Sequence, residues 1–354
     1  MSADFDAQGL ALSARAFATS RLGPQLTNLK PANTLKWRRG KAHARAGTRN
    51  ARIAFIGDST TGGVGAIAPF NVPELLGARA KARGWSVYAE NLFGSLDQVD
   101  TRLVQGGWGG LLNTAGGAMQ HSNATGAPLA FTPTQAFDTI VIAYPRNGPL
   151  GSFAVNVDGG ASLGTINQSG SAALMTTTFT VSLGVHTVNL TWAAGLAYVA
   201  SIRTCNSAAK GLEIANMGIS GAKAIDWISE AQPWDTLAAL KAYAPDLTVI
   251  NLCINDIING PTPIPSFTTS MTAIVTAAKL SGDVVLVVPE QIGDFAQFHA
   301  AIRSLSAGLD VGLYDLAERW LGVAAAPEWM SDGIHPSASG YADIAEGLVP
   351  LLGA

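Results

Sequence analysis

Three side chains that could cooperate in catalysis lie near opposite ends of the chain. Ser59 follows an apolar run at residues 53–56, and Gly57 permits a sharp turn between them. Such a run is typical of a buried parallel strand, so we expect Ser59 at the carboxyl end of that strand, where open α/β sheets bind their ligands. Asp332 and His335 supply a carboxylate and an imidazole three residues apart. Their chemistry depends on whether these two segments meet.

The elements that would position these side chains show alternating strand and helix patterns in two stretches. In the first, residues 72–83 predict a helix closed by Gly84, and residues 85–92 predict a second strand. Further strands are expected at 212–215, 246–253, 283–288 and 311–316, and helices at 234–243, 265–280, 295–307 and 339–352. This alternation predicts an α/β fold with three layers, α/β/α, around a central parallel sheet.

Residues 93–205 show a different pattern. Glycine and small polar residues dominate, and short β-branched runs are separated by turns such as residues 158–160. Several short strands in series predict a small β-sandwich. A strand-helix-strand unit needs only about 30 residues. We therefore interpret 93–205 as an inserted all-β sandwich domain, within a discontinuous catalytic domain of residues 51–92 and 206–354.

Four polar motifs occur at the ends of the expected α/β elements. They are Gly57-Asp58-Ser59, Asn216-Met217-Gly218-Ile219-Ser220-Gly221, Ile254-Asn255-Asp256 and Asp332-Gly333-Ile334-His335. In this order they resemble the SGNH (GDSL) hydrolase family, whose marker residues are a serine, a glycine, an asparagine and a histidine. The resemblance covers roughly residues 51–92 and 206–354. It implies an SGNH, flavodoxin-like fold and a serine esterase that works through an acyl-enzyme, with no metal and no organic cofactor.

The resemblance also implies a role for each matching residue. Ser59 would be the nucleophile, His335 the base that takes its proton, and Asp332 the carboxylate that orients the imidazole. A serine hydroxyl is a poor nucleophile until an adjacent base accepts its proton. The oxyanion would be held by the backbone N–H groups of Ser59 and Gly221 and by the side-chain amide of Asn255.

Two features depart from the family pattern. The family usually has a glycine two residues before the asparagine, and this chain has Cys253, so a shift of the backbone is expected there. The β-rich insertion separates Ser59 from Gly221, but insertions at the edge of a sheet are tolerated. Since Asp332 fills the role of the catalytic acid, Asp58 is expected only to stabilise its turn.

Other interpretations of these motifs remain open. A lone serine after a strand is more often a turn residue or a helix cap. Residues 218–222 approach the G-x-S-x-G elbow of α/β-hydrolases, which would make Ser220 the nucleophile, although the fifth position is Ala222. Residues 63–68, with Glu90, approach a dinucleotide-binding fingerprint, but the first glycine lies seven residues after the strand.

Composition narrows the possible partners. The net charge is -3 and only 13% of the residues are charged, so the chain has no overall positive potential that would attract a nucleic acid. The two cysteines cannot form a disulfide framework, and no metal-ligand cluster can be recognised. The first twenty residues include Asp4 and Asp6 and do not resemble a secretory signal, and no apolar run is long enough to span a membrane. We therefore expect a soluble chain, of undetermined location and oligomeric state, that acts on an ester.

The first 50 residues are expected to form a basic, partly helical arm. Residues 30–52 contain eight Lys or Arg and no acid. A solvated helix face is the simpler explanation, and contact with an anionic polymer is the alternative.

The inserted β region bears on the substrate. By analogy with family members that carry such additions, we expect an O-acetyl carbohydrate esterase, with an acetylated polysaccharide as substrate. The alternatives are a general short-acyl esterase whose insertion is a lid, and a non-catalytic glycan-binding or phage-tail module. Trp108, flanked by glycines, could stack on a sugar ring or pack as an ordinary buried indole.

Overall fold

The computed structural model describes residues 25–66, 68–94, 100–290, 295–321 and 328–353. A seven-stranded sheet in this part of the chain has the order β1-β19-β18-β17-β2-β16-β3. Its strands are β1 (Leu26–Thr27), β2 (Ala51–Gly57), β3 (Val87–Tyr88), β16 (Leu212–Gly218), β17 (Leu247–Asn251), β18 (Asp283–Val288) and β19 (Gly312–Asp315). Neighbouring strands are parallel except β1, which pairs antiparallel with β19.

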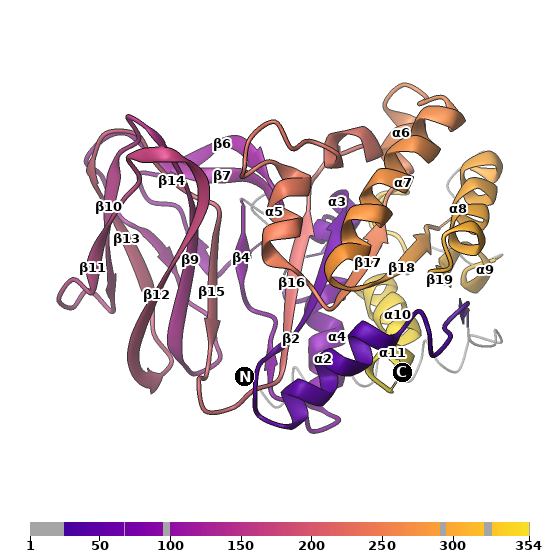
Figure 1. Cartoon of the computed structure of the whole chain (residues 1–354), viewed down its shortest axis with the longest axis horizontal. Coiled ribbons are helices and arrows are strands. Elements are labelled where there is room, and N and C mark those ends of the chain that lie inside the picture. The colour runs from indigo at the N-terminus through magenta and orange to yellow at the C-terminus, as the bar shows by residue number, and fades with distance from the viewer. Residues whose placement is uncertain (1–24, 67, 95–99, 291–294, 322–327, 354) are drawn as a thin grey trace.

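Helices cover both faces of this sheet (Figure 1). Along β2, Ile53 and Phe55 belong to one core and Ala54 and Ile56 to the other, because side chains of a strand alternate between its faces. Against the first core pack α2 (Leu35–Arg45), α4 (Val72–Lys81), α10 (Ala338–Leu348) and α11 (Pro350–Gly353), and against the second α5 (Thr236–Tyr243), α7 (Ile264–Ser281) and α8 (Ala296–Gly308). The predicted three-layer α/β/α architecture is therefore confirmed.

Four short helices follow strands at the carboxyl edge of the sheet or close after it. They are α3 (Ser59–Gly62), the 3₁₀ helix η2 (Ala224–Trp227), α6 (Ile254–Ile258) and α9 (Leu316–Arg319). The motifs that the sequence singled out after β2, β16 and β17 thus lie at one edge, where parallel strands end together.

A β-rich region lies to one side of the central sheet (Figure 1). It comprises a five-stranded sheet, β11-β10-β13-β8-β5, a four-stranded sheet, β12-β9-β15-β4, and a three-stranded sheet, β14-β7-β6. The strands are β4 (Leu92–Phe93), β5 (Leu103–Val104), β6 (Gly109–Thr114), β7 (Gly117–Ser122), β8 (Leu129–Phe131), β9 (Phe137–Gly148), β10 (Ser152–Val157), β11 (Gly164–Asn167), β12 (Gly170–Gly184), β13 (Val188–Ala194), β14 (Ala197–Val199) and β15 (Ser201–Cys205).

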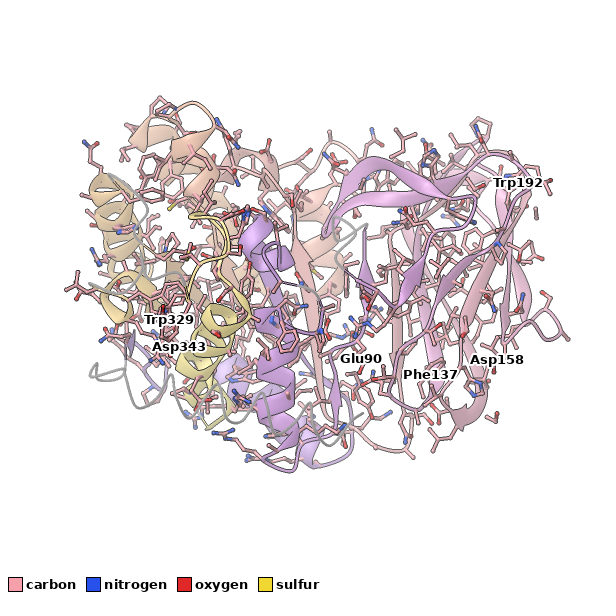
Figure 2. All side chains as sticks on the ribbon, turned by 180° about the vertical axis from the view of Figure 1, so that it is seen from behind. Glu90, Phe137, Asp158, Trp192, Trp329 and Asp343 are labelled. Carbon is pink, nitrogen blue, oxygen red and sulfur yellow. The ribbon has the colours of Figure 1, made fainter. Side chains whose placement is uncertain are left out.

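The two larger sheets of this region share one hydrophobic core. Phe153 and Leu190 of the five-stranded sheet pack in it with Phe137 and Ile142 of the four-stranded sheet, and all four are fully buried. Figure 2 labels Phe137 in this region and Asp343 on α10, at the other end of the molecule. The division into domains at residues 50, 92 and 205 stays a prediction.

The predicted strand at residues 85–92 is wrong in extent. The chain forms two short strands there, β3 in the central sheet and β4 in the four-stranded sheet. Between them the side chain of Asn91 donates to the carbonyl of Tyr88 and accepts from the N–H of Thr204. These side-chain hydrogen bonds replace the backbone hydrogen bonds that a continuous strand would form. The chain therefore leaves the central sheet after β3 and joins the four-stranded sheet at β4.

The N-terminal arm is described only from residue 25. Its basic stretch includes the helix α2, in which Trp37 and Ala44 are buried while Arg38 and Arg39 are exposed. The expectation about a signal sequence concerns residues outside the described ones. Among the helices that are described, none combines the length and the apolar content that a membrane crossing requires.

Candidate active site

Ser59 is the first residue of α3, directly after the end of β2. Asp58 caps this helix, because its Oδ1 accepts from the N–H of Thr60 at 2.9 Å and from the hydroxyl of Thr60 at 2.7 Å. Burial raises the pKa of Asp58 to about 6, although the bonds from Thr60 oppose this effect. The first N–H groups of a helix have no acceptor within it, so the N–H of Ser59 is available to a ligand.

The loop before α10 brings an imidazole to this serine. His335 Nε2 lies 2.9 Å from Ser59 Oγ, and His335 Nδ1 lies 2.8 Å from Asp332 Oδ2. A carboxylate can only accept, so Nδ1 carries the proton and Nε2 is free to accept from the serine hydroxyl. The segment with Ser59 and the segment with Asp332 and His335 therefore meet. The imidazole of His335 is hydrogen-bonded to both Ser59 and Asp332.

Backbone donors fix the carboxylate of Asp332. Its Oδ1 accepts from the N–H groups of Ile334 at 3.0 Å and of His335 at 2.8 Å. Partial burial alone would raise the pKa of Asp332, but these bonds and the bond to the imidazole hold it at about 2. The group is thus ionised at neutral and mildly acidic pH, and it keeps the imidazole in one orientation.

Two glycines permit the close approaches that the site needs. A Cβ at Gly65 would lie 2.5 Å from Ser331 Oγ and 2.8 Å from the Cβ of His335, so only a glycine lets the loop after α3 lie against the histidine loop. A Cβ at Gly218 would lie 2.2 Å from the backbone N of Gly62, so the end of β16 can touch α3 only through a glycine.

Asn255 and Gly221 lie in two segments that are tied together. Asn255 is buried, and its Nδ2 donates to the carbonyl of Ala222 at 3.2 Å, next to Gly221. Asn259 Nδ2 donates to Asn255 Oδ1 at 2.7 Å, which fixes the amide so that its nitrogen faces the 220–222 turn. The amide nitrogen carries a second hydrogen that can be offered to a ligand.

Cys253 takes a backbone conformation that normally requires glycine. Its φ is 147°, in a region where a Cβ causes strain. The side chain is fully buried, and burial raises the pKa of its thiol well above the usual range. The backbone thus keeps a conformation suited to glycine while carrying a cysteine, and the buried thiol is unsuited to act as a nucleophile.

Trp108 does not present an indole face to solvent. It is 5% exposed and packs edge-on against Phe153, with ring centroids 5.8 Å apart, in the core of the β-rich region. A sugar cannot stack on a buried ring, so the structure argues against the predicted contact. Trp108 directly precedes strand β6, and the structure favours the alternative of a packed indole.

No role was predicted from the sequence for three polar residues that lie close to α3. Asn251, at the end of β17, donates from Nδ2 to Thr60 Oγ1 at 2.9 Å, and Asn216, in β16, donates to the carbonyl of Gly62 at 3.2 Å. Glu290, two residues after β18, is 1% exposed. Asn251 and Glu290 lie at or just after the end of an apolar strand, which was the available signal, but their burial could not be predicted from the sequence.

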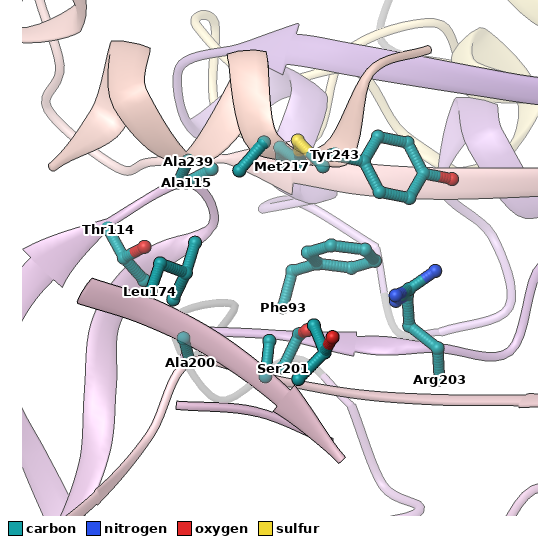
Figure 3. Close-up of a pocket in the computed structure, with 13 residues that line it drawn as sticks. Phe93, Thr114, Ala115, Leu174, Ala200, Ser201, Arg203, Met217, Ala239 and Tyr243 are labelled. Carbon is teal, nitrogen blue, oxygen red and sulfur yellow. The ribbon is translucent and has the colours of Figure 1, made fainter. Parts of the chain in front are cut away.

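A separate cavity of about 190 Å³ lies between the β-rich region and the central sheet (Figure 3). Phe93, Leu174, Met217 and Tyr243 are among its lining residues, and the side chains proposed for catalysis are not. In the described part of the chain, no group of three or more His, Cys, Asp or Glu side chains is arranged to hold a metal.

Comparisons with known proteins bear on the family and the fold. The family model of the GDSL-like lipase/acylhydrolase family matches residues 184–342, which include every predicted site residue after the insertion but not Ser59. A solved structure of a peptidoglycan O-acetylesterase is similar over 92% of this chain and 97% of its own, with 18% identity and a TM-score of 0.67.

Two weaker structural likenesses are to carbohydrate esterases. A family two carbohydrate esterase from Cellvibrio japonicus shares 14% identity over 73% of this chain and 96% of its own, with a TM-score of 0.32. A two-domain esterase active on acetylated mannans shares 12% identity over 90% of this chain and 53% of its own, with a TM-score of 0.44. A search of curated proteins finds no match. Residues 184–342 thus match a GDSL-like lipase/acylhydrolase domain, and the described part of the chain has the SGNH hydrolase fold.

Proposed function

We propose that this protein removes O-acetyl groups from a polysaccharide, with Ser59 as the nucleophile. The observation that carries the proposal is the hydrogen-bonded chain from Ser59 Oγ through His335 to Asp332, with separations of 2.9 and 2.8 Å. This is the arrangement that converts a serine hydroxyl into a nucleophile, because each neighbour orients the next.

In the acylation step, Ser59 Oγ attacks the acetyl carbonyl carbon while His335 Nε2 takes the hydroxyl proton. The imidazolium that forms is stabilised by the ionised Asp332. When the tetrahedral intermediate collapses, the C–O bond to the sugar breaks, and the same proton passes from Nε2 to the departing sugar oxygen. The products of this step are a free sugar hydroxyl and an acetyl group on Ser59.

In the deacylation step, a water molecule attacks the acetyl-enzyme and His335 takes one of its protons. Collapse of the second intermediate breaks the bond to Oγ, and the proton returns to the serine. In both steps the negative oxygen would be held by the N–H groups of Ser59 and Gly221 and by Asn255 Nδ2. One such donor typically contributes about 3 to 4 kcal/mol to lowering the barrier.

The proposal of an acetylated polysaccharide as the substrate rests on a structural likeness that extends over most of the chain. The likeness to the peptidoglycan O-acetylesterase extends over 92% of this chain, so it includes much of the β-rich region as well as the α/β part. A large β-sheet region beside the catalytic edge offers an extended surface to a polymer, whereas a short-acyl ester needs only a cleft. The glycan itself is left to the experiment.

The test is acetate release from a panel of acetylated substrates, namely peptidoglycan, xylan, mannan and an aryl acetate. We expect release from at least one polymer, loss of all activity in Ser59→Ala, and retained activity in Ser220→Ala. Full activity in Ser59→Ala would overturn the assignment of the nucleophile. Hydrolysis of aryl acetate and of aryl esters with longer acyl chains, without acetate release from any of the polymers, would favour the general short-acyl esterase instead.

A further inference from the structure

A small cavity lies beneath the helix that carries Ser59. Its volume is about 20 Å³, and its polar lining comes from four elements. Thr61 belongs to α3, Asn251 ends β17, Glu290 follows β18, and Tyr341 lies on α10. The cavity therefore lies between the central sheet and the helix layer of α4 and α10, next to the helix that begins with the proposed nucleophile.

Three polar atoms from this lining lack hydrogen-bond partners among the described residues. They are Thr61 Oγ1, Asn251 Oδ1 and Glu290 Oε1, and each is itself inaccessible to solvent. Buried polar groups in native proteins nearly always have a partner, so each such atom calls for an explanation. All three residues line the same cavity, so a single ligand in that cavity would explain why the three atoms have no partner.

The cavity has the size and the chemistry of a water site. A water molecule requires about 10–15 Å³ and two to four polar partners, whereas empty cavities are apolar. We propose that one water molecule occupies this cavity, bound by Glu290, Asn251 and Thr61, and that this site positions α3 and hence Ser59. The positioning part of the proposal rests on the proposed role of Ser59, and the water site itself does not.

Hydrogen bonds connect the cavity to both sides of Ser59. On one side, Asn251 Nδ2 donates to Thr60 Oγ1 at 2.9 Å, and that hydroxyl donates to Asp58 Oδ1 at 2.7 Å. On the other side, Tyr341, which also lines the cavity, donates to the carbonyl of Val64 at 2.6 Å. Glu290 thus acts on the serine through the helix and is a positioning residue that does not touch the substrate.

The charge state of Glu290 fits this role. Burial raises its pKa to about 8, and the nearby Asp58 adds to the effect. The other titratable groups that face it are Cys253, Tyr314 and Tyr341, and the pKa of each of these is itself raised by burial. Near neutral pH the carboxyl is therefore protonated and, like a glutamine amide, can both donate and accept.

The experiment compares Glu290→Leu, which removes the polar group, with Glu290→Gln, which keeps it. With an aryl acetate at pH 7, we expect kcat to fall about tenfold or more in Glu290→Leu with little change in KM, and to stay within about threefold of the original in Glu290→Gln. Ile302→Val, a buried change in α8 away from the cavity, controls for general loss of stability. Above pH 8 the activity should decline in the original protein but not in Glu290→Gln.

A crystal structure of the original protein tests the water site directly. We expect a water molecule within hydrogen-bond distance of Glu290 Oε1, Asn251 Oδ1 and Thr61 Oγ1. An unoccupied cavity in a well-resolved map would overturn the site. A folded Glu290→Leu protein with unchanged kcat, or a Glu290→Gln protein as impaired as Glu290→Leu, would overturn the positioning role.

These outcomes are separable from failure of the proposed function. If Ser59→Ala stays active, the nucleophile is misassigned, but the crystal structure still decides the water site. If Ser59→Ala is inactive and Ser59 reacts with a fluorophosphonate, the Glu290 variants alone decide the positioning role. Should Glu290→Leu not fold, the Glu290→Gln pH profile and the crystal structure remain decisive.

Discussion

The buried carboxyl of Glu290 should make the stability of this protein fall as the pH rises. Its ordinary pKa is 4.5, and burial raises the pKa in the folded state to about 8. Below 4.5 the group is protonated in both states and contributes no pH dependence. Between these values the unfolded chain releases the proton and the folded chain retains it, so the free energy of unfolding decreases with pH. Above about 8 both states are ionised and the decrease ends.

The size of the effect follows from the width of this window. Each pH unit within it costs about 1.4 kcal/mol of unfolding free energy. From pH 5 to pH 7.5 the loss is therefore about 3 kcal/mol. A chain of 354 residues has an unfolding entropy of roughly 0.7 kcal/mol per kelvin, so this loss lowers the Tm by about 4 °C.

Glu290→Gln removes the titration while keeping a polar side chain of nearly the same shape. Both proteins are measured by scanning calorimetry between pH 5 and 8 at constant ionic strength. The Tm of the variant minus the Tm of the original protein should increase by about 4 °C over this range. Asp58, whose pKa burial also raises, is present in both proteins.

Glu230→Gln, at an exposed side chain, controls for the loss of one charge. Parallel Tm profiles of the original protein and Glu290→Gln would refute the reasoning, because a neutral carboxyl in the folded state must appear as this divergence.

Three further substitutions probe the site. Asp332→Asn should lower kcat roughly 10,000-fold in aryl acetate hydrolysis at unchanged KM. The matched change Asp158→Asn alters another aspartate–histidine pair, in the β-rich region where Figure 2 labels Asp158, and should leave kcat unaltered; equal losses would contradict the assignment. Gly65→Ala should lower kcat about 10- to 100-fold, because the added Cβ displaces His335; normal turnover would contradict the close approach. Cys253→Gly should be more stable than Cys253→Ala by about 1 to 3 kcal/mol in denaturant unfolding, and the opposite order would show that φ is unstrained.

The parts of the site that could be predicted from the sequence are those specified by local pattern. An apolar run ending in a glycine places Ser59 at the end of β2, and three-residue spacing lets Asp332 reach the ring of His335 through its own loop. Neither inference needs to know what packs around the segment. At Cys253 the sequence drew attention to the right position, but the backbone keeps a conformation suited to glycine where a shift was expected.

Residues whose role depends on burial could not be found in this way. Glu290 follows an apolar strand, as many solvent-exposed acids do, and only the packing of α3, β17 and α10 around it makes it neutral. Trp108 shows the same dependence on burial. The sequence left open whether its indole stacks on a sugar ring or packs, and the core that covers it is assembled from strands distant in the sequence.

The length of the β-rich insertion has little bearing on the geometry of the site. Strands β2 and β16 pair directly, with Gly218 opposite Gly57, although the whole β-rich region separates them in sequence. The entropy of closing a loop grows only slowly with its length, whereas a steric clash at the closing point cannot be relieved by a longer loop. The contact of Gly218 with α3 therefore constrains the sequence more than the 93–205 segment does. For this reason, substitutions at Gly65 or Gly218 should disturb catalysis more than changes in the length of surface loops in the β-rich region.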